Sequence, residues 1–310
     1  MALYVNASPE PQTPRKQKTL GKDGPESPGK EGRQFVTALA RGLKILSCFS
    51  KTNAELGSSD LAKMTGLPQP TVWRLCHTMI CLGYLVTVKG EKMRPGIPTL
   101  RLGYAALASL TIPELSRPEL QELADQYSAA AGLAVRDGSE MVFVQRCQSD
   151  SQLLMNLRIG SRVPLASSAL GWAYLVALSE KRRATAFAEI EAMDRQRWRT
   201  LKDHLQRAVD EYKTKGYVLN IGYFHPGYNT AAVPILGPDG MPRYAINCGS
   251  AAVTLDAATL HSKVAPRLVK LAVELQSVVR DREGVASGSA LGKNVASRAH
   301  AVPRRRAPDS

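Results

Sequence analysis

Side chains that can hydrogen-bond to DNA are concentrated between Leu67 and Gly83. Apolar residues at Val72, Leu75 and Met79 recur at helical spacing, which predicts a helix with one buried face. The opposite face carries polar, cationic and aromatic side chains, namely Gln69, Thr71, Trp73, Arg74, His77 and Thr78. Groups of these types contact base edges and phosphate oxygens, so the segment is a candidate for a helix that reads the major groove.

The neighbouring segments predict the elements that would position this helix. Apolar spacing over residues 36–49 predicts a first helix, and a cap at Ser58 with a stop at Gly66 predicts a short second one. Residues 84–97 then predict a hairpin with a basic turn. In this order the elements form a winged helix-turn-helix over residues 35–98. Further candidate DNA contacts are Ser58, Ser59, Lys89, Lys92 and Arg94.

Two alternatives stay open for these residues. A charged helix face and a charged turn, each taken alone, are also typical of a surface that only contacts water. Trp73 is a large apolar side chain on a face that is expected to be exposed. It can either stack on a sugar of the DNA or pack against the preceding helix.

The distribution of charge favours a nucleic-acid partner. The chain of 310 residues has a formal net charge of +14, with 41 Lys and Arg against 27 Asp and Glu. Residues 35–98 hold eight basic and three acidic side chains, whereas residues 99–284 hold 22 and 19. A basic module joined to a nearly neutral body indicates DNA binding by the module and a different task for the body.

The apolar content of the remaining segments predicts two terminal tails, a linker helix and a second domain. Residues 1–34 and 285–310 have few apolar side chains, so we expect a disordered tail at each end, the second one basic. The apolar stretch over residues 99–113 predicts a linker helix that packs either on its own domain or on a second subunit. Residues 114–284 alternate predicted strand pairs with helices, which indicates an α+β domain with an antiparallel sheet.

Several classes of protein are disfavoured. The chain has no stretch of about 18 apolar residues and no secretory signal, so we expect a cytoplasmic protein without a membrane partner. Its five cysteines fit buried thiols better than a disulfide framework. Phosphate-binding, nucleophile-elbow and zinc-protease motifs are missing, so no enzyme, cofactor or metal site is predicted. The alternatives are a ligand-converting enzyme domain fused to a DNA-binding module, and a non-specific nucleic-acid binder.

A resemblance to a known family rests on five sequence blocks in one order. They occupy residues 40–46, 66–75, 162–171, 215–217 and 226–234. Together they resemble the IclR family of bacterial transcriptional regulators over about residues 35–276. The resemblance implies a winged helix-turn-helix, a linker helix and a GAF-like effector-binding domain. It also implies a homodimer or dimer of dimers that binds double-stranded operator DNA as a repressor or activator under the control of a small-molecule effector.

The same resemblance places the lining of the effector site. The matched positions are Ala169, Leu170, Asn220, Tyr228, Thr230, Asn247 and Gly249. They include neutral hydrogen-bonding groups but no Lys or Arg, and aromatic residues at 172, 174, 223, 224 and 228 lie in the same segments. We therefore expect a largely apolar effector, aromatic or a small organic acid, from a catabolic pathway. A carboxylate would rely on the backbone amides at Ser168–Leu170.

Overall fold

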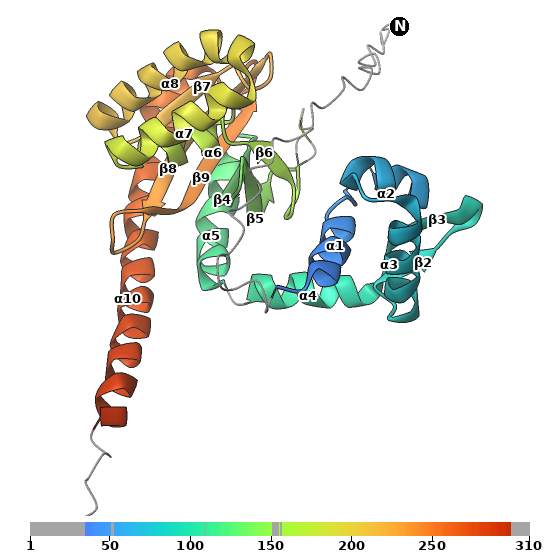
Figure 1. Cartoon of the computed structure of the whole chain (residues 1–310). Helices are drawn as coiled ribbons and strands as arrows, with labels where there is room; N and C mark the ends of the chain where they lie inside the picture. Colours follow the sequence, from blue (N-terminus) through green and yellow to red (C-terminus); the bar gives the residue numbers. More distant parts are fainter. Residues whose placement is uncertain (1–34, 51–52, 109, 151–154, 156, 299–310) are drawn as a thin grey trace, which may run out of the picture. The chain divides into compact units, whose positions relative to one another are not determined.

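The computed structural model describes residues 35–298, apart from 51–52, 109, 151–154 and 156, and side chains up to Asp281. The predicted tail at residues 1–34 and the last part of the other tail, residues 299–310, lie outside the described residues. The chain divides into two compact units, residues 1–104 and 105–310. The division falls within helix α4 (Ile97–Ala108), which Figure 1 shows as a single helix. Within the described ranges, no helix is long and apolar enough to cross a membrane.

The first unit is a small helical domain with a three-stranded sheet in the order β1-β3-β2. Its buried core is formed by Ile45, Leu61, Val72 and their neighbours from all three helices and the hairpin. This arrangement confirms the predicted winged helix-turn-helix. Its elements are α1 (Thr37–Leu46), β1 (Leu56–Gly57), α2 (Ser58–Thr65), α3 (Gln69–Cys81), β2 (Leu85–Thr87), η1 (Lys89–Glu91) and β3 (Lys92–Pro95).

Local sequence signals fix the ends of α2 and α3. The Asp60 carboxylate accepts a hydrogen bond from the Gly57 backbone N–H at 3.1 Å, which satisfies a donor at the start of α2. Gly66 ends α2 with a φ of 69°, a conformation that costs glycine little. Pro70 lies in the first turn of α3, where a missing N–H breaks no helical hydrogen bond.

The second unit contains one six-stranded antiparallel sheet in the order β6-β5-β4-β9-β8-β7. This sheet, with the helices around it, confirms the expected α+β class. The elements are α5 (Thr111–Gln126), β4 (Ala130–Asp137), β5 (Glu140–Gln148), β6 (Arg162–Pro164), α6 (Ala169–Val176), α7 (Glu180–Met193), α8 (Arg195–Lys215), β7 (Val218–Ile221), β8 (Tyr228–Leu236), β9 (Pro242–Ala251), α9 (Ala257–Thr259), η2 (Leu260–Val264) and α10 (Ala265–Arg298).

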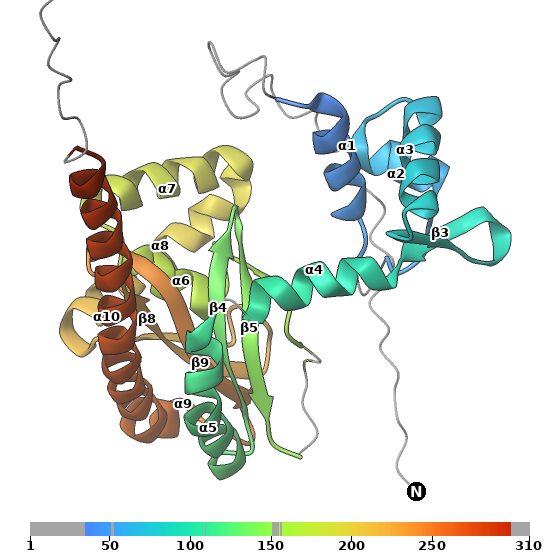
Figure 2. The same cartoon turned by 90° about the horizontal axis from the view of Figure 1, so that it is seen from below.

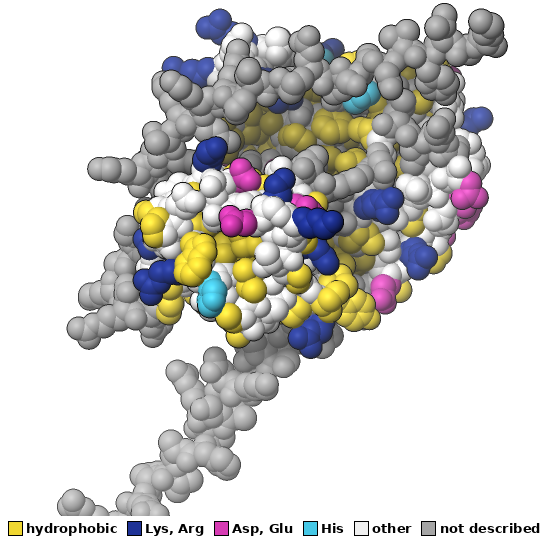
Figure 3. Space-filling view, turned by 90° about the vertical axis from the view of Figure 1, so that its right-hand side faces the viewer, with side chains coloured by type: hydrophobic (Ala, Val, Ile, Leu, Met, Phe, Trp, Pro, Cys, Tyr) yellow, Lys and Arg dark blue, Asp and Glu magenta, His cyan; other side chains and the backbone are white. Residues whose placement is uncertain are grey.

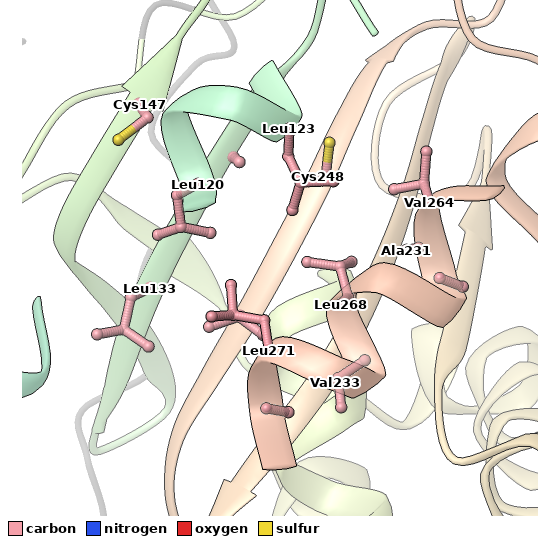
Figure 4. Packing of buried hydrophobic residues seen from close by; sticks show 14 of the residues in the cluster. Leu120, Leu123, Leu133, Cys147, Ala231, Val233, Cys248, Val264, Leu268 and Leu271 are labelled. Atoms are coloured by element: carbon pink, nitrogen blue, oxygen red, sulfur yellow. The ribbon is translucent and has the colours of Figure 1, made fainter. Parts of the chain in front are cut away.

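Helices cover both faces of this sheet, as Figure 2 shows. Helices α5 and α10 pack on one face, where Leu120 and Leu268 join a core with Cys248 from β9 (Figure 4). Helices α6 and α8 pack on the other face in a second buried cluster. Because both faces of the sheet are covered, β8 is buried over nearly its whole length. The strands therefore hold the side chains that point toward α6 in fixed positions.

Two expected boundaries differ from the structure. The linker helix expected over residues 99–113 ends at Ala108, and α5 begins at Thr111. Pro113 lies in the first turn of α5 rather than ending a helix, because a proline is tolerated where the backbone N–H has no helical partner. The basic tail expected from residue 285 is helical through Arg298, as a continuation of α10.

Candidate DNA interface and effector site

Helix α3 separates a buried face from an exposed face. Val72, Cys76 and Met79 are buried, at 0, 2 and 8% exposure. Of the candidate DNA contacts, Thr71 and Ser58 are half-buried, and the others are exposed, namely Ser59, Gln69, Trp73, Arg74, His77, Thr78, Lys89, Lys92 and Arg94. Helical periodicity therefore brings the predicted α3 side chains onto one solvent-accessible face.

Contacts among these residues order the exposed face. The Gln69 amide donates to the Ser59 hydroxyl at 3.3 Å and joins the starts of α2 and α3. Trp73 is 59% exposed and stacks on His77, with ring centroids 5.4 Å apart. Trp73 thus stays available to solvent instead of packing into the core under α2. Figure 3 shows hydrophobic side chains exposed among Lys and Arg on one face of the molecule.

The candidate effector residues share one face of the second sheet. Asn247 of β9 pairs with Gly132 of β4 on one side and with Ala232 of β8 on the other. Gly249 lies two residues further along β9 and pairs with Thr230. Residues two apart on a strand point to the same side, so these positions all face α6. The sheet register therefore assembles residues that are far apart in the sequence.

A narrow cavity of about 20 Å³ lies at this place. Five of the seven predicted effector residues line it, Ala169, Leu170, Tyr228, Thr230 and Asn247, together with Phe143, Arg146, Met155, Leu157, Val163, Ser168 and Phe224. The other two predicted residues act around it. The Asn220 amide donates to the Ser167 carbonyl and accepts from the Phe224 N–H, both at 2.9 Å, so it ties two loops together. A side chain at Gly249 would meet the Thr230 hydroxyl at 2.6 Å.

The start of α6 contributes backbone donors to the cavity. The Ser168 hydroxyl accepts from the Gly171 N–H at 3.1 Å, and the first backbone bond of the helix runs from the Trp172 N–H to the Ser168 carbonyl. The amides of Ala169 and Leu170 precede that bond, in the part of a helix that attracts negative groups. Gly171 allows the preceding turn to approach, because a Cβ there would lie 1.9 Å from the Leu165 carbonyl oxygen.

Arg146 of β5 also lines the cavity, which corrects the expectation that no Lys or Arg does. Its guanidinium lies over the Phe143 ring, 4.9 Å from the centroid, and its buried Nε has no hydrogen-bond partner among the described residues. Burial raises the pKa of Tyr228, and the positive charge of nearby Arg146 opposes that rise only in part. The Tyr228 hydroxyl donates to the Gly249 carbonyl at 2.8 Å.

A β-bulge explains why the sequence did not predict Arg146 in the cavity lining. The hairpin of β4 and β5 pairs Ala134 with Phe143, but the next pair is Leu133 with Gln145, so Val144 is the extra residue. Without the bulge, strict alternation would place Gln145 opposite Gly132 and turn Arg146 to the other face. The turn at Asp137-Gly138 indicates a hairpin, but no sequence signal marks the extra residue.

The predicted aromatic wall is only partly assembled. Phe224 and Tyr228 line the cavity, whereas Trp172 packs against Tyr223 and His204 in a separate cluster. Tyr174 lies elsewhere, under the guanidinium of Arg136. Among the side chains that the structure describes, no group of three or more His, Cys, Asp or Glu could hold a metal ion.

A larger cavity of about 500 Å³ lies between the β4–β5 hairpin and helices α7 and α8. Its walls include Ile190, Met193 and Trp198, with Arg136 and Glu189 among the charged groups. The buried polar atoms that lack partners in the described part of the chain are Arg146 Nε, Ser167 Oγ and Asn247 Oδ1. Two of these belong to the small cavity and none to the large one, so unmet hydrogen-bonding demand is concentrated beside α6.

Comparisons with known proteins now decide the family. The family model described as bacterial transcriptional regulator IclR C-terminal matches residues 104–276, and the IclR helix-turn-helix domain matches residues 38–89. The chain belongs to the IclR family. The family assignment confirms the resemblance found in the sequence, and the protein is a DNA-binding transcriptional regulator.

Individual IclR-family proteins are similar over most of their length. The HTH-type transcriptional regulator TsaQ1/TsaQ2 of Comamonas testosteroni is 28% identical over 259 residues, which cover 83% of this chain and 93% of that protein. The p-hydroxybenzoate hydroxylase transcriptional activator of Acinetobacter baylyi is 26% identical, with coverages of 79 and 92%. An IclR family transcriptional regulator from Brucella abortus, known from a crystal structure, shares 37% of its sequence with this chain. The two structures superpose with a TM-score of 0.74 over 83% of this chain and 96% of that one. All three relatives are described as transcriptional regulators or activators.

Proposed function

We propose that this regulator binds operator DNA through α3 and its wing, and that a small organic effector beside α6 controls the binding. The effector is largely apolar, aromatic or a small organic acid. The observation that carries the proposal is the cavity between α6 and the sheet, where Asn247 is buried and its Oδ1 lacks a partner among the described residues. A buried acceptor without a donor is costly, and a ligand that donates to it removes that cost.

The size of this cavity supports a switch. A volume of about 20 Å³ has room for about one water, so an organic effector must displace lining side chains such as Phe224. The ligand then binds an expanded state and not the closed one. Unequal affinity for two states is what a ligand needs in order to shift the balance between them.

For DNA binding we propose that the α3 face enters the major groove. Arg74 and Gln69 are exposed there and can form paired hydrogen bonds to base edges. Lys89, Lys92 and Arg94 of the wing contact phosphates. The exposed Trp73–His77 stack offers a flat apolar surface to the DNA backbone.

We also propose that the protein acts as a homodimer or dimer of dimers. Helix α4 has no buried residue, and Ile97, Leu100 and Tyr104 are about 70% exposed. Leu39 and Leu43 of α1 are exposed as well. So much apolar helix surface is typical of a protein interface, and a second copy of this chain fits the two-fold symmetry of operators.

A gel-shift titration tests the proposal. The protein should bind DNA from upstream of its own gene more tightly than random DNA of equal length at two salt concentrations, and an effector identified by thermal shift should alter that binding. Asn247→Leu should abolish the response to the effector while leaving operator affinity within about twofold, since it removes the hydrogen bonds and roughly keeps the volume. Equal affinity for both DNAs would contradict operator recognition, and a normal response in the variant would contradict the site.

A further inference from the structure

We infer that Arg146 is the anion-binding residue of the effector site, and that the effector is an organic acid with one carboxylate and one hydroxyl group. The carboxylate pairs with Arg146 near the start of α6, and the hydroxyl donates to Asn247 Oδ1. This inference rests on the proposed function, because it takes the cavity beside α6 as the effector site.

Arg146 points from β5 into the cavity beside α6. The bulge at Val144 turns Arg146 toward the same face as Phe143, and the strand register places it opposite Gly132. On the other side of Gly132 lies Asn247. Gly132 has no side chain, and the Phe143 ring takes that space, since a Cβ at Gly132 would lie 2.6 Å from the ring. Two strand spacings, about 10 Å between Cα atoms, therefore separate two polar side chains that have an aromatic ring between them. A small, flat ligand with a polar group at each end can stack on this ring and reach both.

Arg146 and Asn247 each have a buried polar atom that lacks a hydrogen-bond partner among the described residues. The Arg146 guanidinium hydrogen-bonds with the Tyr228 side chain. Among the described residues, however, its buried Nε has no partner, and Arg146 forms no salt bridge. A guanidinium can only donate, so the group that completes it is an acceptor, best an anion. Asn247 is 7% exposed, and its Oδ1 can only accept, so the group that completes it is a donor. One ligand with both properties satisfies both residues.

The rest of the cavity lining suits an apolar molecule with one negative charge. The amides of Ala169 and Leu170 at the start of α6 add a second favourable contact for a carboxylate. Phe143, Val163 and Leu170 supply apolar walls for the body of the ligand. No Asp or Glu lines this cavity among the described residues, so an organic cation would find no counter-charge there. A dianion is disfavoured too, because Arg146 is the one cationic side chain among the described residues that line this cavity.

Titration calorimetry and thermal shift with four probes test the inference: 4-hydroxybenzoate, benzoate, phenol and 4-hydroxybenzamide. We expect 4-hydroxybenzoate to bind more tightly than the other three. Arg146→Gln should weaken its binding at least tenfold, and Arg146→Lys should weaken it less. Arg146→Gln should also raise the melting temperature of the free protein, because it removes a partly buried charge that has no acidic partner among the described residues. Arg136→Gln, in the wall of the larger cavity, is the matched control and should leave binding within about twofold.

Different outcomes separate this inference from the proposed function. If an acid binds, Asn247→Leu abolishes binding and Arg146→Gln does not, then the site stands and the role of Arg146 is wrong. If Arg136→Gln alone abolishes binding, the effector occupies the larger cavity and both ideas fall. Tighter binding of phenol or the amide than of the acid overturns the inference, and so does failure of 4-hydroxybenzoate to bind the wild-type protein.

Discussion

The two units of this regulator position their functional side chains by different means. On α3, one helix and its 3.6-residue period carry the exposed row that includes Gln69, Arg74 and His77. In the second unit, Arg146, Asn247 and Thr230 come from three strands and meet only through the register of the sheet. The candidate DNA-binding face is therefore a local property of the chain, whereas the candidate effector site is a property of long-range pairing. A local error harms the first site little, but a slip of one residue destroys the second.

The same substitution in both units gives the largest expected contrast. Gly171→Ala in α6 places a Cβ 1.9 Å from the Leu165 carbonyl oxygen, so we expect a loss of about 1–3 kcal/mol or more in the free energy of unfolding. Gly42→Ala in α1 meets no atom within 4 Å and should stabilise the helix by about 0.5–1 kcal/mol. Chemical denaturation of both variants measures the two changes. A stable Gly171→Ala protein would show that the turn before α6 can move away.

Arg74→Ala tests whether α3 alone controls recognition. The side chain is exposed and lies on the candidate DNA face, so we expect the fold to survive and the preference for operator over random DNA to fall by about 1–3 kcal/mol. Gel-shift titrations with both DNAs measure this preference. Lys63→Ala, an exposed change in the last turn of α2 away from the candidate contacts, is the control. Unchanged discrimination by Arg74→Ala would show that another element reads the bases.

The reactivity of cysteine thiols should also differ between the two units. Cys81 at the end of α3 is exposed, whereas Cys248 in the sheet is fully buried and its burial raises the pKa of the thiol to about 12. The thiolate is the reactive form, so at pH 8 a thiol reagent should label Cys81 rapidly and leave Cys248 unlabelled until the protein unfolds. Mass spectrometry of the labelled peptides checks the order. Early labelling of Cys248 would mean that the sheet opens readily.

Removal of residues 1–34 should have the smallest effect. This segment has six basic and four acidic residues, so it can add only weak, salt-dependent attraction to phosphates. We expect the truncated protein to keep its preference for operator over random DNA within about twofold. Loss of the preference in a gel-shift competition would show that the segment itself reads DNA.

The same contrast explains how far the sequence could predict this protein. Helical spacing, the start of α2 near Ser58, its stop at Gly66 and the basic hairpin were enough for the winged helix-turn-helix, although the residue that caps α2 is Gly57 and not Ser58. In the second unit, the family resemblance indicated the turn before α6 and the positions of Tyr228, Thr230 and Asn247. Arg146 was missed because its direction depends on one extra residue in β5, and the roles of Asn220 and Gly249 depend on packing between distant loops.

The bulge in β5 has a consequence for how relatives of this protein are aligned. Deletion of Val144 would remove the extra residue, while Gln145 would stay opposite Leu133 and Arg146 would stay opposite Gly132. A side chain at the position of Arg146 therefore faces α6 in a strand that is one residue shorter as well as in the bulged strand. An alignment without a gap at Val144 would equate Gln145 with the cavity-facing residue of a regular strand and would hide Arg146.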